Sequence, residues 1–379
     1  MPTTFAVTGA AGYIGSHIVS ILLSKGHTVH ATVRSLAAAS AFAHLSSLPG
    51  AAERLRIFEA DACGTDVAAG ERALMEAFAG ATGVVHAASP YDLAAVDQEA
   101  PALAGVRAAL RAAASSPSVQ RVALTSSAAA VYVSKKPADY YYTELDWSTE
   151  EALEGLAYHS AKTKAERLAW AMVEDGGECA LQRDAAGAPR LMLATLCPTQ
   201  TIGPALGSRL NQSLALLLPY VDGSAKSIPA KGKCLVDVRD VALAHVLAVE
   251  GAAAPRNGER ERYLLVAGSL PWSAICDIMR SVEGARVPTV RDAGVSSPQA
   301  LCSVRGAARL GVHFRPLEDS IIDATRPLPL LHRVAHERSA RGRTILLLVT
   351  RGPIEHVEER LASECERARQ IVADRERGE

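Results

Sequence analysis

A glycine-rich turn lies near the start of this chain, Thr8-Gly9-Ala10-Ala11-Gly12-Tyr13-Ile14-Gly15, and limits the folds open to it. A short apolar run precedes the turn, and an apolar-periodic stretch from Tyr13 to Lys25 follows it. This order predicts a strand, a tight turn and a helix, the opening half of a βαβ unit. Glycines here allow a pyrophosphate to approach the free N–H groups of the helix. The turn therefore predicts a dinucleotide site at Gly9, Gly12, Tyr13, Ile14 and Gly15.

Strand-like runs recur along the first half of the chain and alternate with Ala-rich stretches long enough for crossover helices. The runs are 28–33, 55–59, 83–86, 121–125 and 191–196, and the helical stretches include 71–78 and 101–114. Such alternation is typical of an α/β protein. We therefore predict a Rossmann-type, doubly wound parallel sheet.

The pattern divides the chain into three expected parts. Residues 1–197 form the NADP-binding Rossmann domain, with a polar, glycine-rich surface loop at 174–189. Residues 198–330 lose the regular alternation and predict a smaller, irregular substrate lobe, in which 210–221 looks helical and 234–250 returns to the Rossmann core. Residues 331–379 form a C-terminal extension whose near-heptad apolar spacing predicts an amphipathic helix.

Composition argues against several classes of partner. Forty Lys and Arg balance 41 Asp and Glu, which does not favour a nucleic-acid surface. No apolar run reaches the ~20 residues of a membrane span, and the first strand begins too early to leave room for a secretory signal. The seven cysteines contain no CxxC pair, so neither a disulfide framework nor a metal site is predicted. We expect a cytoplasmic monomer or homodimer whose partners are small molecules.

The residue at the end of the second strand indicates which dinucleotide binds. An acid ~20 residues after the glycines usually holds the ribose 2′-OH of NAD, whereas a basic residue there favours the 2′-phosphate of NADP. Here the strand ends in Arg34, and no acidic residue lies between Gly15 and Glu53. The sequence therefore favours NADP as the cofactor.

The catalytic candidates are a Tyr-x3-Lys pair and two serines. Tyr158 and Lys162 share one face of a predicted helix, and Ser126 and Ser127 follow the fifth strand. A tyrosine with a pKa near 10 is a poor proton donor and acceptor at neutral pH unless a neighbouring cation favours its phenolate. Lys162 can supply that charge, and a serine can hydrogen-bond a carbonyl oxygen. Either serine could serve.

Two other candidates fit the pattern less well. Tyr132 and Lys136 form a second Tyr-x3-Lys, but the segment is β-branched and runs into Pro137, which opposes a helix. His86 ends the fourth strand among small residues, where a packed histidine with satisfied hydrogen bonds is expected rather than a base.

Taken in order, these motifs make the chain similar to the extended short-chain dehydrogenase/reductase superfamily. Within it, the chain resembles the dihydroflavonol reductase and cinnamoyl-CoA reductase group. The superfamily resemblance rests on TGAAGYIG, LTSSAAAVY, YHSAK and LVDVRDVALAHV. The resemblance to the group rests on HATVRS, TSSAAAV, LNQSLALLLPYVDGSAKSIP, VDVRDVA and LGVHFRPLEDSIID, and the likeness covers about residues 1–330. It implies an NADPH-dependent reductase that transfers a hydride to a ketone or aldehyde, reversibly an alcohol dehydrogenase. The stretch EGLAYHSAK lacks the NWYCY-type motif of cinnamoyl-CoA reductases, which argues against thioester reduction.

The resemblance also implies a role for individual residues. It makes Ser127 the serine that orients the carbonyl, with Ser126 as its rival, Tyr158 the acid and Lys162 the residue that binds the nicotinamide ribose. The further cofactor contacts that it implies are Arg34 on the 2′-phosphate, Asp61 near the adenine, Ala87 and Thr125 beside the ribose and nicotinamide, and Pro198 against the nicotinamide.

Other functions can be built from the same parts. A sugar-nucleotide epimerase or dehydratase, or a hydroxysteroid dehydrogenase, would cycle or oxidise the cofactor, although Arg34 argues against an epimerase that retains NAD. A non-catalytic NADP-sensing or scaffold protein would keep the fold, but the intact Ser, Tyr and Lys set argues against it. The reductase is the expected function, and its substrate stays open.

Overall fold

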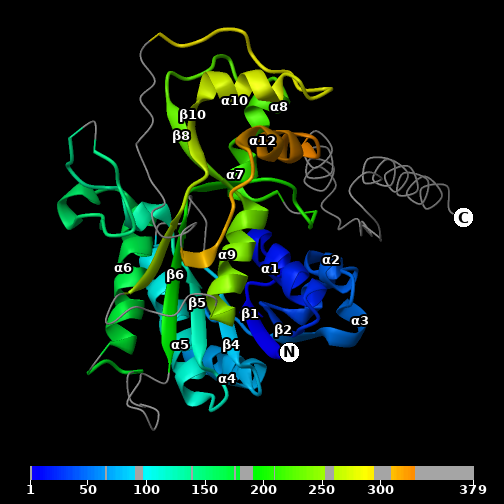
Figure 1. The fold of residues 1–379 in the computed structure, drawn as a ribbon, viewed down its shortest axis with the longest axis vertical. Coiled ribbons are helices and arrows are strands. Elements are labelled where there is room, and N and C mark those ends of the chain that lie inside the picture. Colours follow the sequence, from blue (N-terminus) through cyan, green and yellow to red (C-terminus); the bar gives the residue numbers. More distant parts are fainter. Residues whose placement is uncertain are drawn as a thin grey trace, which may run out of the picture.

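The computed structural model describes residues 2–64, 66–89, 97–137, 140–174, 176–179, 191–208, 210–251, 260–293 and 309–328. Figure 1 shows a large sheet flanked by helices, with a smaller group of strands and short helices beyond one end of it. The C-terminal extension 331–379 and most of the expected loop at 174–189 lie outside the described residues. No helix in the described part is long and apolar enough to cross a membrane.

The large sheet has seven strands, and every neighbouring pair in it is parallel. In spatial order the strands are β3 (Leu55–Glu59), β2 (Thr28–Val33), β1 (Thr4–Thr8), β4 (Gly83–His86), β5 (Arg121–Thr125), β6 (Met192–Pro198) and β9 (Glu261–Leu265). Helices cover both faces of such a sheet, so its strands read as nearly continuous apolar runs. The predicted doubly wound α/β fold is confirmed.

Sequence analysis did not predict β9, because its charged residues interrupt the apolar pattern. The structure buries both charges and pairs them. Glu261 lies 3.2 Å from the Arg121 guanidinium, and Arg262 lies 2.7 Å from the Glu166 carboxylate. A buried charge is tolerated only with such a partner, which a one-dimensional pattern cannot reveal.

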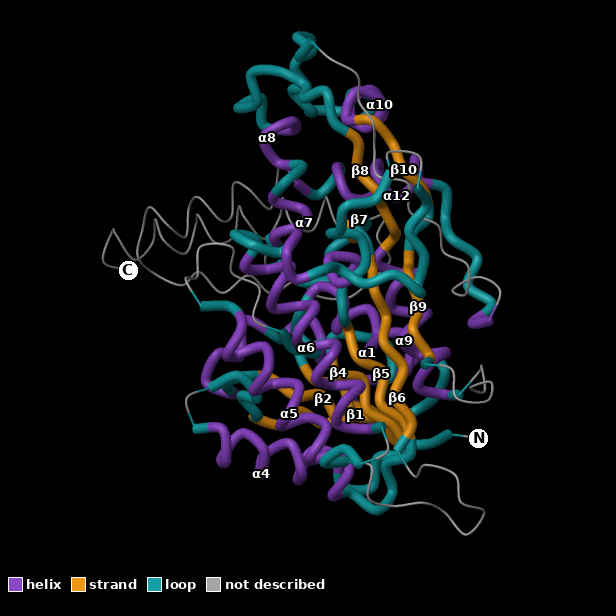
Figure 2. Tube along the Cα trace, turned by 90° about the vertical axis from the view of Figure 1, so that its left-hand side faces the viewer, coloured by secondary structure: helices purple, strands orange, loops and turns teal. Residues whose placement is uncertain are grey.

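In the described part of the chain, long helices cover the sheet in two groups, one on each face (Figure 2). The first group comprises α4 (Val67–Phe78), α5 (Glu99–Ser115) and α6 (Ala157–Val173), and the second α1 (Tyr13–Ser24) and α9 (Val238–Glu250). Each group packs its apolar side on the sheet, which gives one hydrophobic core per face. The helices predicted at 13–25, 71–78 and 101–114 correspond to α1, α4 and α5.

The strand order reverses between β1 and β4, which lie side by side at the centre of the sheet. Ligands of open α/β sheets bind beyond the carboxyl ends of the strands at such a reversal, because the crossovers on either side leave to opposite faces. The glycine turn follows β1 and therefore lies at this point.

A second, three-stranded sheet lies beyond this edge of the large sheet (Figure 1). It consists of β7 (Gln200–Ile202), β8 (Gly232–Asp237) and β10 (Gly268–Pro271), and packs with α7 (Gln212–Ala215), α8 (Leu218–Val221), α10 (Trp272–Met279) and α12 (Leu317–Thr325). The single helix expected at 210–221 is instead two one-turn helices. Pro219 explains the break, because it has no N–H to continue the hydrogen-bond ladder.

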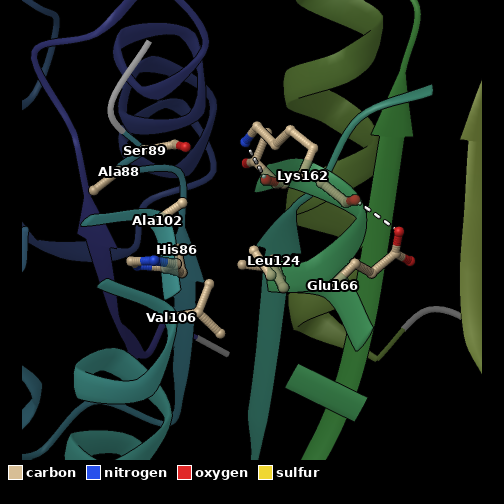
Figure 3. Close-up of a pocket in the computed structure, with 11 residues that line it drawn as sticks. His86, Ala88, Ser89, Ala102, Val106, Leu124, Lys162 and Glu166 are labelled. Atoms are coloured by element: carbon tan, nitrogen blue, oxygen red, sulfur yellow. Dashed lines mark hydrogen bonds between the residues drawn. The ribbon is translucent and has the colours of Figure 1, made fainter. Parts of the chain in front are cut away.

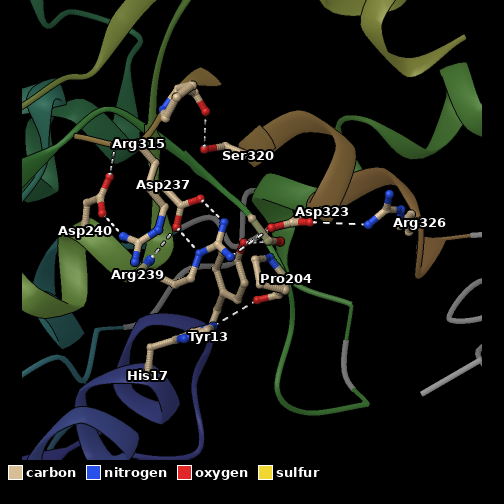
Figure 4. Close-up of polar contacts among 12 residues, drawn as sticks. Tyr13, His17, Pro204, Asp237, Arg239, Asp240, Arg315, Ser320, Asp323 and Arg326 are labelled. Carbon is tan, nitrogen blue, oxygen red and sulfur yellow. Dashed lines mark hydrogen bonds and ion pairs between the residues drawn. The ribbon is translucent and has the colours of Figure 1, made fainter. Parts of the chain in front are cut away.

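Polar contacts join the region of this second sheet to α1 and α12 (Figure 4). Arg239 donates to the buried Asp237 at 2.9 Å and lies 2.8 Å from Asp323 of α12. The Tyr13 hydroxyl of α1 donates to the Gly203 carbonyl at 2.7 Å. The first helix of the large sheet is thus tied directly to the chain that leaves β7.

Candidate active site

The three glycines of the turn differ in their surroundings: Gly9 and Gly15 are tightly packed, whereas Gly12 has space beside it. Gly9 has a φ of +64°, and a Cβ there would lie 2.8 Å from the Ala88 backbone. A Cβ at Gly15 would lie 2.2 Å from the Gly9 carbonyl oxygen, so the helix is packed on its own turn. At Gly12 a Cβ would meet only that same oxygen, at 3.0 Å, among the described atoms. Gly12 therefore faces open space at the helix N-terminus.

The first turn of α1 offers its N–H groups to a ligand. Gly12 is the N-cap, and within the described residues no side chain caps this turn and no acid lies in it. The side chains that follow point elsewhere: the Tyr13 hydroxyl bonds Gly203, and Ile14 packs against the core. Free N–H groups and a positive helix end suit an anion. The turn fits the pyrophosphate of a dinucleotide.

The other residues expected at the cofactor lie at the same edge of the sheet. Arg34 follows β2 and is exposed, and Asp61 lies just after β3, where its carboxylate accepts a backbone N–H two residues on. Ala87 follows β4 and packs against Gly9, and Pro198 ends β6 and is buried. Parallel strands bring their carboxyl ends to one edge, so these positions converge.

The hydroxyls of Tyr158 and Ser127 meet above the end of β5. Tyr158 stands in the first turn of α6 and donates to Ser127 Oγ at 3.5 Å. Ser127 also accepts the Ala129 N–H at 3.1 Å, so its own proton is left to donate to a ligand. Lys162, one helical turn after Tyr158, donates to the Thr125 carbonyl at 3.3 Å. The structure brings the predicted Ser, Tyr and Lys together.

Lys162 is buried next to a pocket that opens between the ends of β4 and β5 (Figure 3). Its lining includes His86 and Ser89 from the β4 side, Thr125 and Ser126 from the β5 side, and Lys162 itself. Burial lowers the pKa of Lys162 to about 8, against partial compensation by the charge of Glu166. The Lys162 ammonium is therefore a desolvated cation, one helical turn along α6 from Tyr158.

The two neighbouring serines have different surroundings. The Ser126 hydroxyl donates to the buried Glu166 carboxylate at 2.7 Å, whereas the Ser127 hydroxyl accepts from Tyr158. This geometry favours Ser127 as the serine available to a substrate. Sequence analysis missed Glu166, although its position one helical turn beyond Lys162 was a readable signal.

The competing candidates do not form sites of this kind. Lys136 lies 4.8 Å from the ring centroid of Tyr140, while the Tyr132 hydroxyl lies 3.3 Å from His159, so Tyr132 and Lys136 have separate partners. His86 is buried and bonds the Thr8 hydroxyl at 2.8 Å, and burial lowers its pKa to about 4. It is packed and neutral, as predicted.

A glycine turn suited to an anion at the strand reversal, together with a Ser, Tyr and Lys set at the next strand ends, is typical of a dinucleotide-dependent oxidoreductase. Comparison with known proteins agrees. The sequence model of the "NAD dependent epimerase/dehydratase family" matches residues 5–263, and the chain belongs to this family. The prediction of an extended short-chain dehydrogenase/reductase is thereby confirmed.

Individual relatives are reductases. "Cinnamoyl-CoA reductase CAD2" of Medicago truncatula is 35% identical over 335 residues, 85% of this chain and 94% of that protein. "Dihydroflavonol 4-reductase" of Zea mays is 33% identical over 260 residues, 66% of this chain and 68% of that protein. Among solved structures, Gre2 of Candida albicans in complex with NADPH superposes with a TM-score of 0.69 at 26% identity, covering 87% of this chain and all of that one.

Proposed function

We propose that Ser127, Tyr158 and Lys162 are the catalytic residues of an NADPH-dependent reductase that acts on a ketone or aldehyde. The observation that carries this proposal is the 3.5 Å approach of the Tyr158 and Ser127 hydroxyls, with the Lys162 ammonium one helical turn away. The chain's relatives are named as reductases, and Gre2 was crystallised with NADPH. An enzyme that reduces carbonyl groups is the function that both support.

NADPH, when bound, supplies the hydride. The turn at Gly9, Gly12 and Gly15 holds its pyrophosphate through the N–H groups of α1, with Tyr13 and Ile14 contributing backbone only. Arg34 pairs with the 2′-phosphate, since a guanidinium binds phosphate well. The remaining contacts in this proposal are Asp61 near the adenine, Ala87 and Thr125 beside the ribose and nicotinamide, and Pro198 against the nicotinamide.

The residues of the chain bind the carbonyl oxygen and supply its proton. Ser127 donates a hydrogen bond to the carbonyl oxygen and holds it beside Tyr158. As the carbonyl carbon gains the hydride, the Tyr158 O–H bond breaks and its proton passes to the oxygen, so that the product is an alcohol. The Lys162 cation stabilises the phenolate that remains on Tyr158. In the reverse direction the same groups remove the alcohol proton.

The substrate in this proposal is a small neutral carbonyl compound rather than a thioester, because EGLAYHSAK departs from the thioester-reductase motif. Arg34 argues against an epimerase, because an epimerase that retains NAD would normally have an acidic residue at this position. The intact Ser, Tyr and Lys geometry argues against a non-catalytic scaffold protein. We place the enzyme in the cytoplasm as a monomer or homodimer.

A substrate panel tests the proposal. Purified protein is assayed for NADPH and NADH oxidation with aromatic aldehydes, flavanonols, small ketones and hydroxycinnamoyl thioesters. We expect turnover of at least one aldehyde or ketone with NADPH preferred, and loss of that turnover by at least about 1000-fold in Tyr158→Phe with NADPH affinity within about threefold. Turnover retained by Tyr158→Phe would overturn the site. Silence of the wild-type enzyme across the panel would overturn the function.

A further inference from the structure

Three consecutive residues at the end of β5 are each bonded to one of three residues on a single stripe of α6. Tyr158 donates to Ser127 Oγ at 3.5 Å, and Lys162 donates to the Thr125 carbonyl at 3.3 Å. Between them, Ser126 Oγ donates to Glu166 Oε2 at 2.7 Å. Tyr158, Lys162 and Glu166 follow at i, i+4 and i+8, so they lie on one face of the helix. The catalytic residues therefore occupy two of three parallel links between the same two elements.

The three links differ in strength. A hydroxyl-to-hydroxyl bond is usually 2.7–2.8 Å long, so the 3.5 Å contact of Tyr158 is weak, and the 3.3 Å bond of Lys162 is also long. The Ser126 hydrogen bond has an ordinary length, and both of its residues are buried. Its acceptor is a carboxylate, and an ionised acceptor roughly doubles the energy of a hydrogen bond. Figure 3 shows Glu166 below Lys162, reaching toward the end of β5. The strongest of the three hydrogen bonds is thus the one between Ser126 and Glu166, which are not proposed catalytic residues.

The Glu166 carboxylate is fixed from the other side as well. Arg262 Nε donates to Glu166 Oε1 at 2.7 Å, and Arg262 Nη2 donates to Oε2 at 3.1 Å. Burial by itself would raise the pKa of Glu166, but the Arg262 charge and the hydrogen bonds to Glu166 outweigh it and leave that pKa below its usual value. The acceptor of the Ser126 bond is therefore an ionised group.

Arg262 is in turn held by the segment that follows the serines. Its guanidinium donates to the carbonyls of Glu144 at 2.9 Å and Ala130 at 3.2 Å, and lies 3.8 Å from the ring centroid of Trp147. A carboxylate anchored by such a fixed cation cannot follow a shift of Ser126. Any slip of α6 along β5 must break the Ser126 bond.

We propose that Ser126 and Glu166 are positioning residues: their buried bond fixes α6 on the end of β5 and so sets the distance between the Tyr158 and Ser127 hydroxyls. Ser127 is extended, so the side chains of Ser126 and Ser127 point to opposite sides. One serine anchors while its neighbour faces the substrate. This inference rests on the proposed function, because it takes Tyr158 and Ser127 to be the reacting pair.

Thr195 provides a matched control. Its hydroxyl donates to the other oxygen of Glu166 at the same 2.7 Å, and Thr195 is also buried, but it lies on β6 and is not adjacent to a proposed catalytic residue. Ser126→Ala and Thr195→Val each remove one hydrogen bond to the same carboxylate. A structural role for the cluster predicts equal effects of the two changes on activity, whereas a positioning role for Ser126 predicts unequal ones.

The test measures kcat, KM, NADPH affinity and Tm for both variants. We expect Ser126→Ala to lower kcat about 10- to 100-fold, with KM and NADPH affinity within about twofold, because a displaced reacting pair slows the chemical step. Thr195→Val is expected to keep kcat within about twofold while losing a similar few degrees of Tm. An unchanged kcat in Ser126→Ala, or an equal loss in Thr195→Val, would overturn the positioning role. The proposed function fails separately, by activity retained in Tyr158→Phe.

Discussion

Tyr158 and Ser127 approach each other to 3.5 Å from two different elements, the first turn of α6 and the extended segment after β5. At this separation a carbonyl oxygen beside the pair can lie within hydrogen-bond distance of both hydroxyls and accept from each. In the proposed mechanism neither residue suffices alone, because Ser127 holds the carbonyl oxygen while Tyr158 donates the proton.

Ser127→Ala tests this relationship directly. Removing one preorganised donor to a developing oxyanion typically costs about 100- to 1000-fold in rate, so kcat should fall by that amount. Residues that act as a unit are not additive, and the double variant with Tyr158→Phe should be no slower than Tyr158→Phe alone. Steady-state kinetics of the three variants provides the measurement. A double variant slower by the product of the two single effects would contradict the shared role.

Replacing Lys162 should stabilise the protein while inactivating it. A folded-state pKa of about 8 against an ordinary 10.5 means that protonated Lys162 opposes folding by about 3 kcal/mol. The cost is fully present below pH 8 and fades as the pH rises to 10.5, because the folded state gives up the proton first. Lys162→Met removes it but also loses the hydrogen bond to Thr125, which leaves a net gain of about 2 kcal/mol at pH 7.

Urea unfolding at pH 7 and again near pH 10 measures this gain, which should shrink at the higher pH. Lys164→Met is the control, since Lys164 lies on the same helix but is half exposed and pairs with Glu99 at the surface. It should change stability little at either pH. If Lys162→Met were less stable than the wild type at pH 7, the conclusion that the buried Lys162 charge opposes folding would be wrong.

Arg34 should decide between the two dinucleotides. Arg34→Gln removes the cation proposed for the 2′-phosphate, and loss of a charged hydrogen bond weakens binding by about 10- to 100-fold. NADPH affinity should fall by that factor while NADH affinity stays within about twofold. Arg56, exposed on the neighbouring β3, supplies the matched control Arg56→Gln, which should affect neither. An equal loss of affinity for NADPH and NADH would contradict the assignment of Arg34 to the 2′-phosphate.

The glycines of the turn should separate binding from folding. In Gly12→Ala the new Cβ meets only the Gly9 carbonyl oxygen at 3.0 Å, so the fold should persist while the methyl group fills the space for the pyrophosphate. In Gly15→Ala the Cβ would lie 2.2 Å from that oxygen, so the helix must move off its turn. We expect both variants to lose NADPH binding in calorimetry, and only Gly15→Ala to lose several degrees of Tm. An unchanged Tm in Gly15→Ala would contradict the close packing.

Interactions between residues near in sequence set the local units and their order. The apolar run, the glycines and the amphipathic stretch fix β1, the turn and α1 through interactions of residues near in sequence. Tyr158 and Lys162 share a helix face for the same reason. Alternating strands and helices then permit few arrangements other than a doubly wound parallel sheet, since parallel strands need crossovers of fixed hand.

Contacts between residues far apart in the sequence give Ser126 and Ser127 different partners and explain why β9 can carry charges. Ser126 and Ser127 are identical in type and adjacent in sequence. The difference between them is Glu166, which lies 40 residues from Ser126 and reaches it across the interior. Arg262 is a poor strand residue by pattern and becomes a buried cation because Glu166 neutralises it. Partners distant in sequence set these environments, and in a low-dielectric interior the partner determines whether a polar group is tolerated.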